Sequence, residues 1–398
     1  MTSPRFLQIH FLSSYPGALL NRDDSGLAKR LPFGGGVRTR ISSQCLKRHW
    51  RMTGDARGLH ALAREKGIEA LRSKIAIETE IIAPLRETID EPVLLAIQEA
   101  FLKAVYGDKS PDPKARQALL LGRPELNYLA GEAKRIAAEA GADSKAAGEM
   151  AVELFRKGDG KANLKQLREQ NALAPGLESA LFGRMVTSDV RANTDASIHV
   201  AHAFTVHAEQ PELDYFTVVD DLHQGEDAGA AGIFDTELTS GLYYGYVVVD
   251  VPLLVSNLTG CARGDWGGDV DRRLAARVVE NLLHLIATVS PGAKKGSTAP
   301  YAYADLVLLE AGERQPRTLA NAFRDPVDPD WGKGTLLEKT VAKMAGELSG
   351  LDGMYGAGER RLVAQRGAAL DNVEALSLPD LAARAARMVE MATVSTDG

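Results

Sequence analysis

Acidic residues are missing from one long stretch of an otherwise acidic chain. From Ser25 through Gly54 there is no Asp and no Glu, although the 398 residues contain more Asp and Glu than Lys and Arg, 53 against 47. The stretch holds seven cations: Lys29, Arg30, Arg38, Arg40, Lys47, Arg48 and Arg51. A local concentration of positive charge attracts polyanions, so this stretch predicts a site for nucleic acid or another phosphate-rich ligand. A solvated basic face is the alternative interpretation.

Other shortages exclude whole classes of protein. The only cysteines, Cys45 and Cys261, form no CxxC pair, which excludes a disulfide framework and a cysteine zinc cluster. No apolar run is long enough to span a bilayer, and the first residues, MTSPRFLQIHFL, lack the pattern of a signal peptide. We therefore expect a cytoplasmic protein without a membrane partner. With a net charge of −6, any nucleic-acid site is confined to one groove or loop.

The second half of the acid-free stretch predicts a helix with two different faces. Four polar residues share one face because they stand at i, i+3, i+4 and i+7: Gln44, Lys47, Arg48 and Arg51. Leu46, His49 and Trp50 lie on the other side, where they can dock on a core. Ser42 or Ser43 can cap the first turn. Free N–H groups at this helix N-terminus suit a phosphate, and the cations add to the attraction.

The rest of the chain alternates between regions of strands and regions of helices. Residues 5–14 alternate apolar and polar side chains, the pattern of a half-buried strand. Residues 55–180 are rich in Ala, Leu, Glu, Lys and Arg, which predicts helices. We place these helices at 56–66, 68–88, 91–106, 123–141, 143–157 and 161–170. Because strand patterns resume afterwards, the helical region is an insertion.

The second half of the chain predicts a sheet with a projecting hairpin. Strands are expected at 181–189, 197–210, 214–222, 232–240, 241–254 and 301–312, with a helix at 272–289 and a helical tail after 331. The small polar residues 223–232 predict a mobile hairpin tip. Without the hairpin and the insertion, the order is strand, helix, two or more strands, helix, strand. This βαββαβ order predicts an α+β chain with a ferredoxin-like, RNA-recognition-type fold.

Candidate catalytic or metal-binding groups are few. His199, His202 and His207 are closely spaced, but residues three apart on a strand point to opposite faces, and His199 and His207 are too distant to chelate easily. Asp23-Asp24 and Asp220-Asp221 are adjacent acids of the kind that two-metal nucleases cluster. Turn and capping roles are the stronger interpretation for both pairs, although the first pair lies beside the basic helix. We expect no metal and no cofactor.

Two short motifs only partly match nucleotide-binding signatures. The loop at 292–298, GAKKGST, is not a P-loop because its Lys does not directly precede the Ser or Thr. Lys294 and Lys295 can still contact a phosphate, with plain solvent exposure as the alternative. Tyr244-Gly245-Tyr246-Val247 repeats the middle of the RNP1 signature without the preceding basic residue and Gly. Alternating Tyr and Val are also typical of a sheet core.

Taken together and in order, a series of motifs resembles a known family. They are NRDD at 21–24, FGG at 33–35, RTRISSQCLKR at 38–48, FGRMVTSD at 182–189, VAHAFTVH at 200–207, DYFTVVDDL at 214–222 and PGAK at 291–294. The combination resembles the backbone subunit of the type I-E CRISPR Cascade complex, the CasC family of the RAMP superfamily. The match runs from about residue 5 to residue 325, and neither the helical insertion nor the C-terminal quarter contributes a motif.

The resemblance implies a non-catalytic, crRNA-binding protein of antiviral defence, shaped like a hand. Its parts would be a palm (1–54, 181–210 and 242–330), helical fingers (55–180), a hairpin thumb (211–241) and a C-terminal helical region (331–398). Several copies would stack helically along the guide RNA, each thumb folding over its neighbour's stretch. Further partners would be the target DNA, paired through the guide, and the large subunit, the small subunit, the repeat-processing endonuclease and the subunit that caps the 5′ handle.

The resemblance also implies which residues meet the RNA. Family contacts to the RNA backbone would fall on Arg22, Ser42, Gln44, Lys47, Arg48, Arg51 and Lys294, and the basic stretch adds Arg38 and Arg40 as candidates. Met185 and Ile233 stand where the family places apolar wedges beside a displaced nucleotide. Phosphate contacts accept any guide sequence, and wedges that unstack bases at intervals would hold the guide in short segments ready to pair.

Two other functions stay open from the sequence. Backbone subunits of the related type III effectors resemble this fold and cut target RNA with a loop Asp, so Asp23 or Asp24 would be the catalytic residue of a metal-dependent ribonuclease. A free-standing RNA-binding regulator would instead bind short RNA as a monomer, without stacking along it.

Overall fold

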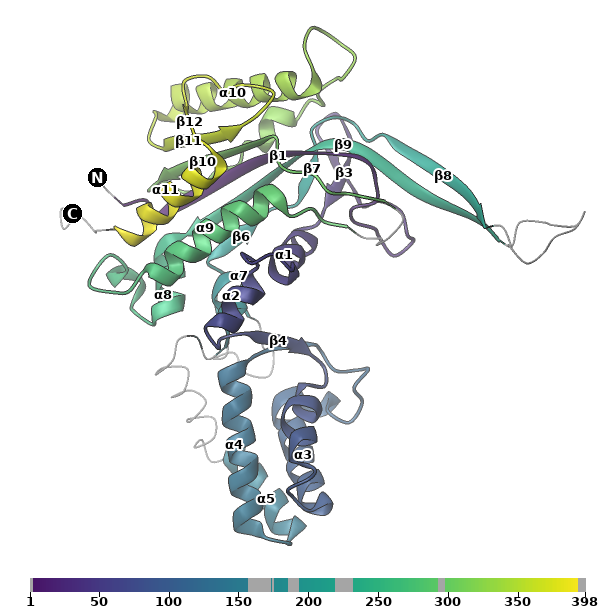
Figure 1. Cartoon of the computed structure of the whole chain (residues 1–398), viewed down its shortest axis with the longest axis vertical. Helices are drawn as coiled ribbons and strands as arrows, with labels where there is room; N and C mark the ends of the chain where they lie inside the picture. The colour runs from purple at the N-terminus through teal and green to yellow at the C-terminus, as the bar shows by residue number, and fades with distance from the viewer. Residues whose placement is uncertain are drawn as a thin grey trace, which may run out of the picture.

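One large sheet organises the chain. The computed structural model describes residues 3–156, 173, 175–184, 193–218, 232–292 and 298–392. The main sheet has the strand order β12-β11-β10-β1-β9-β7-β3-β2. Its central strand β1 (Phe6–Ala18) pairs antiparallel with β9 (Gly232–Asp250) on one side and β10 (Leu306–Gly312) on the other. Helices pack on both faces of the sheet (Figure 1), so the predicted α+β class is confirmed.

Strand β1 is buried on both faces, whereas its alternation predicted a half-buried strand. Leu7 and Ile9 belong to the core beneath the helices, and Leu12 belongs to a second core on the opposite face. The polar residues Gln8 and His10 share that second face and are buried too. They are covered by α10 (Leu336–Tyr355) and by the segment around the 3-10 turn Ala320–Phe323.

The helices that contribute to the core on the first face of the sheet include α1 (Ser43–Met52), α8 (Val251–Thr259), α9 (Arg273–Thr288) and α11 (Leu378–Glu390). Helix α9 confirms the prediction at 272–289, with Val278 and Leu282 fully buried. Helix α8 was not predicted, because its sequence VPLLVSNLT continues the apolar run of β9. The Asp250 carboxylate ends the strand by accepting a hydrogen bond from the Leu253 N–H, which caps the new helix.

The helical insertion forms a bundle with its own core, and Figure 1 shows it projecting from the sheet. Its helices α3 (Glu91–Tyr106), α4 (Arg123–Ala140) and α5 (Ser144–Arg156) confirm three predicted helices, and α2 (Leu59–Glu65) confirms a fourth. The helix predicted at 68–88 is wrong: β4 (Ala70–Ser73) pairs with β5 (Leu119–Gly122), and a π-helix (Ile77–Ile82) and 3-10 turn (Ala83–Leu85) follow β4. The helix predicted at 161–170 lies outside the described residues.

Two predicted strands are interrupted in the structure. Helix α7 (Leu177–Phe182) occupies the start of the strand predicted at 181–189, and Arg184 forms an isolated bridge with Thr194. The strand predicted at 197–210 divides into β6 (Ile198–Val200) and β7 (Ala203–Thr205), both paired with β9. The break between β6 and β7 contains His202.

The predicted hairpin is confirmed in its described part. Strand β8 (Pro211–Val218) pairs antiparallel with the first half of β9, from Pro211 opposite Thr239 to Val218 opposite Gly232. The pair extends away from the rest of the sheet (Figure 1). Of the tip that was predicted at 223–232, only Gly232 is among the described residues. A second hairpin, β2 (Arg30–Phe33) with β3 (Gly36–Ile41), precedes α1.

The tail after residue 331 is not wholly helical. Between α10 and α11, strand β11 (Arg360–Gln365) pairs with β10, and β12 (Glu374–Ala375) pairs with β11. The sequence did not predict strand β11, because its buried residues Leu362 and Val363 are consecutive and do not form an alternating pattern. They enter the cores on opposite faces of the sheet. Pro379 lies in the first turn of α11. No helix among the described residues is both long and apolar enough to cross a membrane.

Candidate nucleic-acid interface

Helix α1 is fixed to the sheet as its two-faced pattern predicts. Leu46 and Trp50 are buried, and the Ser42 hydroxyl accepts a hydrogen bond from the Cys45 N–H at 3.3 Å, which makes Ser42 the N-cap. The Ser42 N–H in turn donates to Asn21 Oδ1 at 2.8 Å. Ser42 itself is buried and thereby holds the helix in place.

The opposite face of α1 carries the predicted polar residues at different depths. Gln44 and Arg48 are exposed, whereas Lys47 and Arg51 are half-buried. Lys47 Nζ lies 5.8 Å from the centre of the Phe182 ring, and Arg51 Nη1 lies 3.2 Å from Glu178 Oε2. Burial lowers the pKa of the Lys47 ammonium, and the charge of nearby Arg72 lowers it further. The four residues therefore share a face, but Arg51 already has a carboxylate partner.

The N-terminus of α1 is not the open phosphate site that we predicted. The Ser43 N–H donates to Nδ1 of His202 at 3.0 Å, the Cys45 N–H to the Ser42 hydroxyl, and the Leu46 N–H to the Ser42 carbonyl. Among the N–H groups of residues 43–46, only that of Gln44 lacks an acceptor within the described chain. Attraction for an anion must therefore come chiefly from side chains.

Arg38 lies in the interior of the protein, which corrects its prediction as a surface ligand of RNA. Its side chain is fully buried. Nη1 donates to the carbonyls of Thr205 and Val206 at 3.1 and 2.9 Å, and Nη2 donates to the carbonyl of Phe323 at 2.9 Å. These bonds tie β3 to β7 and to the 3-10 turn beyond β10, so Arg38 has a structural role.

The other cations of the acid-free stretch are only partly neutralised. Arg30 is ion-paired with Glu209 and Glu237 at the base of the hairpin. Arg40 Nε donates to the Arg30 carbonyl at 3.1 Å. Arg22, which precedes the stretch, is exposed in a loop that is closed by a backbone bridge between Arg22 and Ala28. Within the described chain, four cations of the stretch have no carboxylate partner: Lys29, Arg40, Lys47 and Arg48.

Three groups beside α1 were not among the predicted contacts. Lys29 precedes β2, His202 is exposed between β6 and β7, and Arg72 is exposed on β4. We call Lys29, Arg40, Gln44, Lys47, Arg48, Arg72 and His202 the α1 basic surface. Lys29 already lay in the acid-free stretch and His202 in the motif VAHAFTVH, so a signal existed for both. Arg72 lay outside every motif of the sequence, and its nearness to α1 is shown by its charge, which lowers the pKa of Lys47 and Arg51.

Three predicted contacts are placed only in part. Met185 and Lys294 lie outside the described residues, while Ile233 lies on β9 opposite Thr217 in the hairpin. The segment that precedes Lys294 is nevertheless anchored, because the Gly292 N–H donates to His49 Nε2 at 3.2 Å. The PGAK motif therefore begins against α1.

Of the acidic and histidine candidates, Asp23 and His207 have structural roles. Asp23 Oδ1 accepts a hydrogen bond from the Leu27 N–H at 3.0 Å and so organises its own turn. His207 is buried, and its ring bonds to the Ala208 carbonyl and the Leu242 N–H. Asp24 is exposed, and Asp220-Asp221 lies outside the described residues. In the part of the chain that is described, no three His, Cys, Asp or Glu side chains lie close enough together to hold a metal ion.

The RNP1-like segment is part of the core. Tyr244 is buried, its hydroxyl lies 2.9 Å from His10 Nδ1, and its ring centre lies 5.2 Å from that of Phe323. Burial raises the pKa of Tyr244 well above its ordinary value. The Tyr246 hydroxyl donates to Gln8 Oε1 at 2.7 Å. The Tyr244 ring therefore offers no face on which a base could stack.

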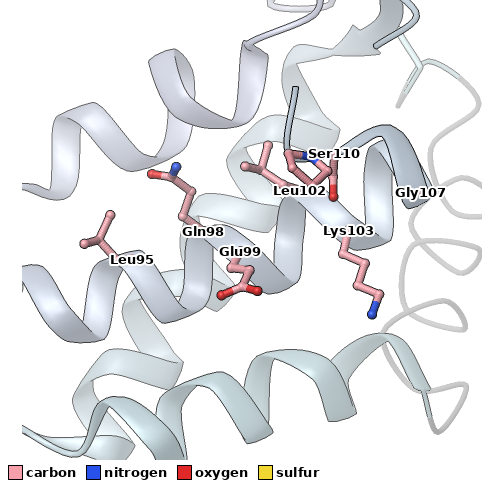
Figure 2. A pocket seen from close by; sticks show the side chains of 8 residues that line it. Leu95, Gln98, Glu99, Leu102, Lys103, Gly107 and Ser110 are labelled. Atoms are coloured by element: carbon pink, nitrogen blue, oxygen red, sulfur yellow. The ribbon is translucent and has the colours of Figure 1, made fainter. Parts of the chain in front are cut away.

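A depression of about 480 Å³ in the helical insertion lies apart from the α1 basic surface. Figure 2 shows Leu95, Gln98, Glu99 and Lys103 on one helix beside it, with Ser110 at its far end. Its lining mixes aliphatic groups with one acid and one lysine, and it gathers no set of groups that indicates catalysis.

Comparisons with known proteins give one matching family model and two similar folds. The model of the family described as CT1975-like protein matches residues 7–390. A chain of a "CRISPR RNA-guided surveillance complex, pre-nicking" has a similar fold, with a TM-score of 0.74 and 24% identity over 96% of this chain and 100% of that chain. A chain of another "CRISPR RNA-guided surveillance complex" has a TM-score of 0.56 and 20% identity over 96% and 98%. No curated protein matches. The protein belongs to the CT1975-like protein family.

Proposed function

We propose that this protein is a non-catalytic crRNA-binding backbone subunit of a type I-E CRISPR surveillance complex. The α1 basic surface is the single observation that carries the proposal. Its cations Lys29, Arg40, Lys47 and Arg48 come from an acid-free stretch and have no carboxylate partner within the described chain. Cations left unpaired at a surface attract phosphates and release the counterions around them. The surface therefore suits the backbone of an RNA.

Topology supports the palm of the proposed hand. Strands β10, β1, β9 and β7 are successive neighbours in the sheet, and α1 and α9 pack on one face of it. Together with the chain order β1, α1, β7, β9, α9 and β10, this arrangement supports the proposal of a ferredoxin-like palm. The fold shared with the two surveillance-complex chains supports the same assignment.

The chemistry of the surface suits a carrier of variable guides. Phosphate contacts give affinity and position without reading sequence, and base pairing in such complexes is left to the guide itself. The hairpin of β8 and β9 would act as the thumb that meets a neighbouring copy, with Leu213 and Tyr215 exposed at 67% and 63% on β8. Ile233 and Met185 would be the wedges beside a displaced nucleotide.

Assembly on RNA tests this function. Purified chain is mixed with CRISPR repeat-spacer RNAs of increasing spacer length, and the mass of each complex is measured by native mass spectrometry. We expect the number of bound copies to rise in steps with spacer length. If the chain binds none of these RNAs, the proposal is wrong; if it binds short and long RNA as a single copy, the protein is a free-standing RNA-binding regulator instead.

A second arm tests the absence of catalysis. The assembled complex is incubated with complementary RNA and Mg²⁺, and the RNA is analysed on a denaturing gel. We expect intact RNA. Cleavage at regular intervals that is lost in both Asp23→Ala and Asp24→Ala would identify a metal-dependent ribonuclease.

A further inference from the structure

His202 occupies an unusual position between the sheet and the basic surface. It lies in the two-residue break between β6 and β7, next to Ala201, whose N–H donates to the Tyr246 carbonyl of β9 at 2.9 Å. Its ring reaches the first turn of α1 and accepts the Ser43 N–H at Nδ1, at 3.0 Å. The side chain is nevertheless exposed. One ring nitrogen is therefore used inside the protein, while the other has no hydrogen-bond partner within the described chain.

The bond to Ser43 fixes the tautomer of His202. A nitrogen that accepts a hydrogen bond from a backbone N–H carries no proton, so the proton of the neutral ring must be on Nε2. Partial burial lowers the pKa of His202, and the charges of Arg40, Lys29 and Lys47 lower it further. The ring is thus a neutral donor, and its Nε2–H points away from the helix.

The same three cations show where this donor lies. Lys29 and Arg40 are held together because the Arg40 N–H donates to the Lys29 carbonyl at 2.7 Å. Lys47 is on the second turn of α1, beside Phe182. The charges of Arg40 on β3, of Lys29 just before β2 and of Lys47 on α1 all act on the His202 ring. Within the described chain none of the three is paired with a carboxylate. A neutral donor among unpaired cations is a suitable environment for one anion.

We propose that His202, Lys29, Arg40 and Lys47 form a subsite for a single phosphodiester group, in which the Nε2–H of His202 donates to a phosphate oxygen. The inference rests on the proposed function, since it takes the anion to be a backbone phosphate of the guide RNA. The cations supply attraction over a distance, whereas the fixed imidazole supplies direction. Because the ring is held by α1, the subsite also sets the position of that phosphate relative to the helix.

Two substitutions separate the donor from the helix cap. In His202→Asn the amide oxygen takes the place of Nδ1 and still accepts the Ser43 N–H, but nothing replaces Nε2. In His202→Gln the longer side chain brings an amide N–H to the place of Nε2, and the cap is lost. Binding of a fluorescent spacer RNA and thermal unfolding are measured for both. We expect roughly three- to ten-fold weaker binding for His202→Asn with an unchanged melting temperature, as for the loss of one hydrogen bond.

The opposite result is expected for His202→Gln, which should bind within about twofold of the wild type, since it keeps the donor, but melt at a lower temperature. His199→Asn is the matched control, because His199 lies opposite Val248 and thus shares the sheet face of Gln8, away from α1. This control should change neither RNA affinity nor melting temperature.

If His202→Asn bound RNA with wild-type affinity, or if RNA affinity fell only in the variants that also melt at a lower temperature, His202 would be only a cap of α1.

The failure of this subsite is distinguishable from the failure of the proposed function. If wild-type protein binds no RNA, the function itself is wrong. If wild-type protein binds RNA and His202→Asn binds equally well, only the subsite is wrong. Competition with inorganic phosphate distinguishes a phosphodiester of RNA from free phosphate as the bound anion. Displacement of RNA by millimolar phosphate at constant ionic strength would mean that the site binds free phosphate rather than a phosphodiester.

Discussion

Arginines of the acid-free stretch have different roles because their partners come from distant parts of the chain. Arg38 donates to carbonyls of Thr205, Val206 and Phe323, whereas Arg48 is exposed on α1. Helical spacing identified the shared face of Gln44, Lys47, Arg48 and Arg51, since that face depends only on local geometry. The same spacing could not show that Arg51 meets Glu178 or that Arg38 is buried, because both facts depend on tertiary packing.

The salt dependence of RNA binding tests the exposed face of α1. In Lys47→Ala combined with Arg48→Ala, two phosphate contacts are removed, each of which releases about 0.7 of a counterion from single-stranded nucleic acid. We expect weaker binding, with the slope of log K against log salt concentration reduced by about 1.4. Titrations of spacer RNA at several salt concentrations measure the slope.

A control of equal charge is available on the helical insertion. Lys134→Ala with Lys145→Ala removes two exposed lysines from α4 and α5, which Figure 1 shows far from α1. The slope should then stay at the wild-type value. A loss of the same size in both double variants would mean that net charge, and not the α1 basic surface, determines binding.

At the scale of helices and strands, amphipathic helices could be predicted from the sequence, whereas elements that are buried on two sides or paired with distant strands could not. The predicted helix 91–106 agrees with α3 because its apolar spacing is a local feature of the sequence. The prediction of a helix at 68–88 was wrong because β4 forms its hydrogen bonds with β5. Helix α3 lies between these two strands in the sequence, so the pairing is not visible from local spacing. Helix α8 was missed because its apolar residues continue the apolar run of β9 and show no helical period of their own. Strand β11 was missed because only Leu362 and Val363 of its six residues are buried, and two consecutive apolar residues do not alternate.

A buried ion pair joins the insertion to the segment through which the chain returns to the sheet. Arg184 Nη1 lies 2.8 and 2.7 Å from the two carboxylate oxygens of Glu125 at the start of α4, and both side chains are buried. Arg184→Met should destabilise the protein by about 3–5 kcal/mol, because a buried carboxylate is left without its partner. Adding Glu125→Gln should restore part of this loss, since the charge is removed while the side chain can still accept from the Gly122 N–H. Thermal unfolding measures both changes.

The exposed arginine of the same helix provides the comparison. Arg135 pairs with Glu132 and Glu139 on the surface of α4, and such pairs contribute about 1 kcal/mol or less. Arg135→Met should therefore leave the melting temperature almost unchanged. If Arg184→Met behaved in the same way, or if the double variant were less stable than the single one, the pair would not be what holds α4.

At the scale of the whole molecule, helices cover both faces of the sheet, and α1 keeps Gln44 and Arg48 exposed on its outer side. An RNA-recognition fold that binds through its sheet needs an open face, but α10 covers the face that carries Tyr244. A charged network lies beneath this cover. Glu310 accepts hydrogen bonds from Arg317 and Arg361, and Arg361 also binds Asp352 on α10. The C-terminal cover is thus held by ionised groups.

This network predicts how stability depends on pH. Burial alone would raise the pKa of Glu310, but hydrogen bonds from Arg317, His10 and Arg361 hold that pKa well below its usual range. A carboxyl group whose pKa is lowered by folding stabilises the protein above its unfolded pKa of about 4.3 and ceases to do so as pH falls through the folded value. Burial also lowers the pKa of His10, so protonation of this residue in the unfolded chain adds to the loss of stability below about pH 6.5.

Glu310→Gln separates this contribution from the rest of the protein. The variant should melt several degrees below the wild type at pH 7, because Arg317 and Arg361 lose their buried partner. The difference should shrink from about pH 4.3 toward pH 3, because Glu310 binds a proton in the unfolded wild-type chain while it stays ionised in the folded protein. Melting temperatures between pH 3 and pH 8 measure the difference. Glu347→Gln on α10 is the control, since Glu347 forms no ion pair within the described chain, and its difference from the wild type should be small at every pH. A difference for Glu310→Gln that stayed constant down to pH 3 would mean that packing, and not charge, holds the C-terminal cover on the sheet.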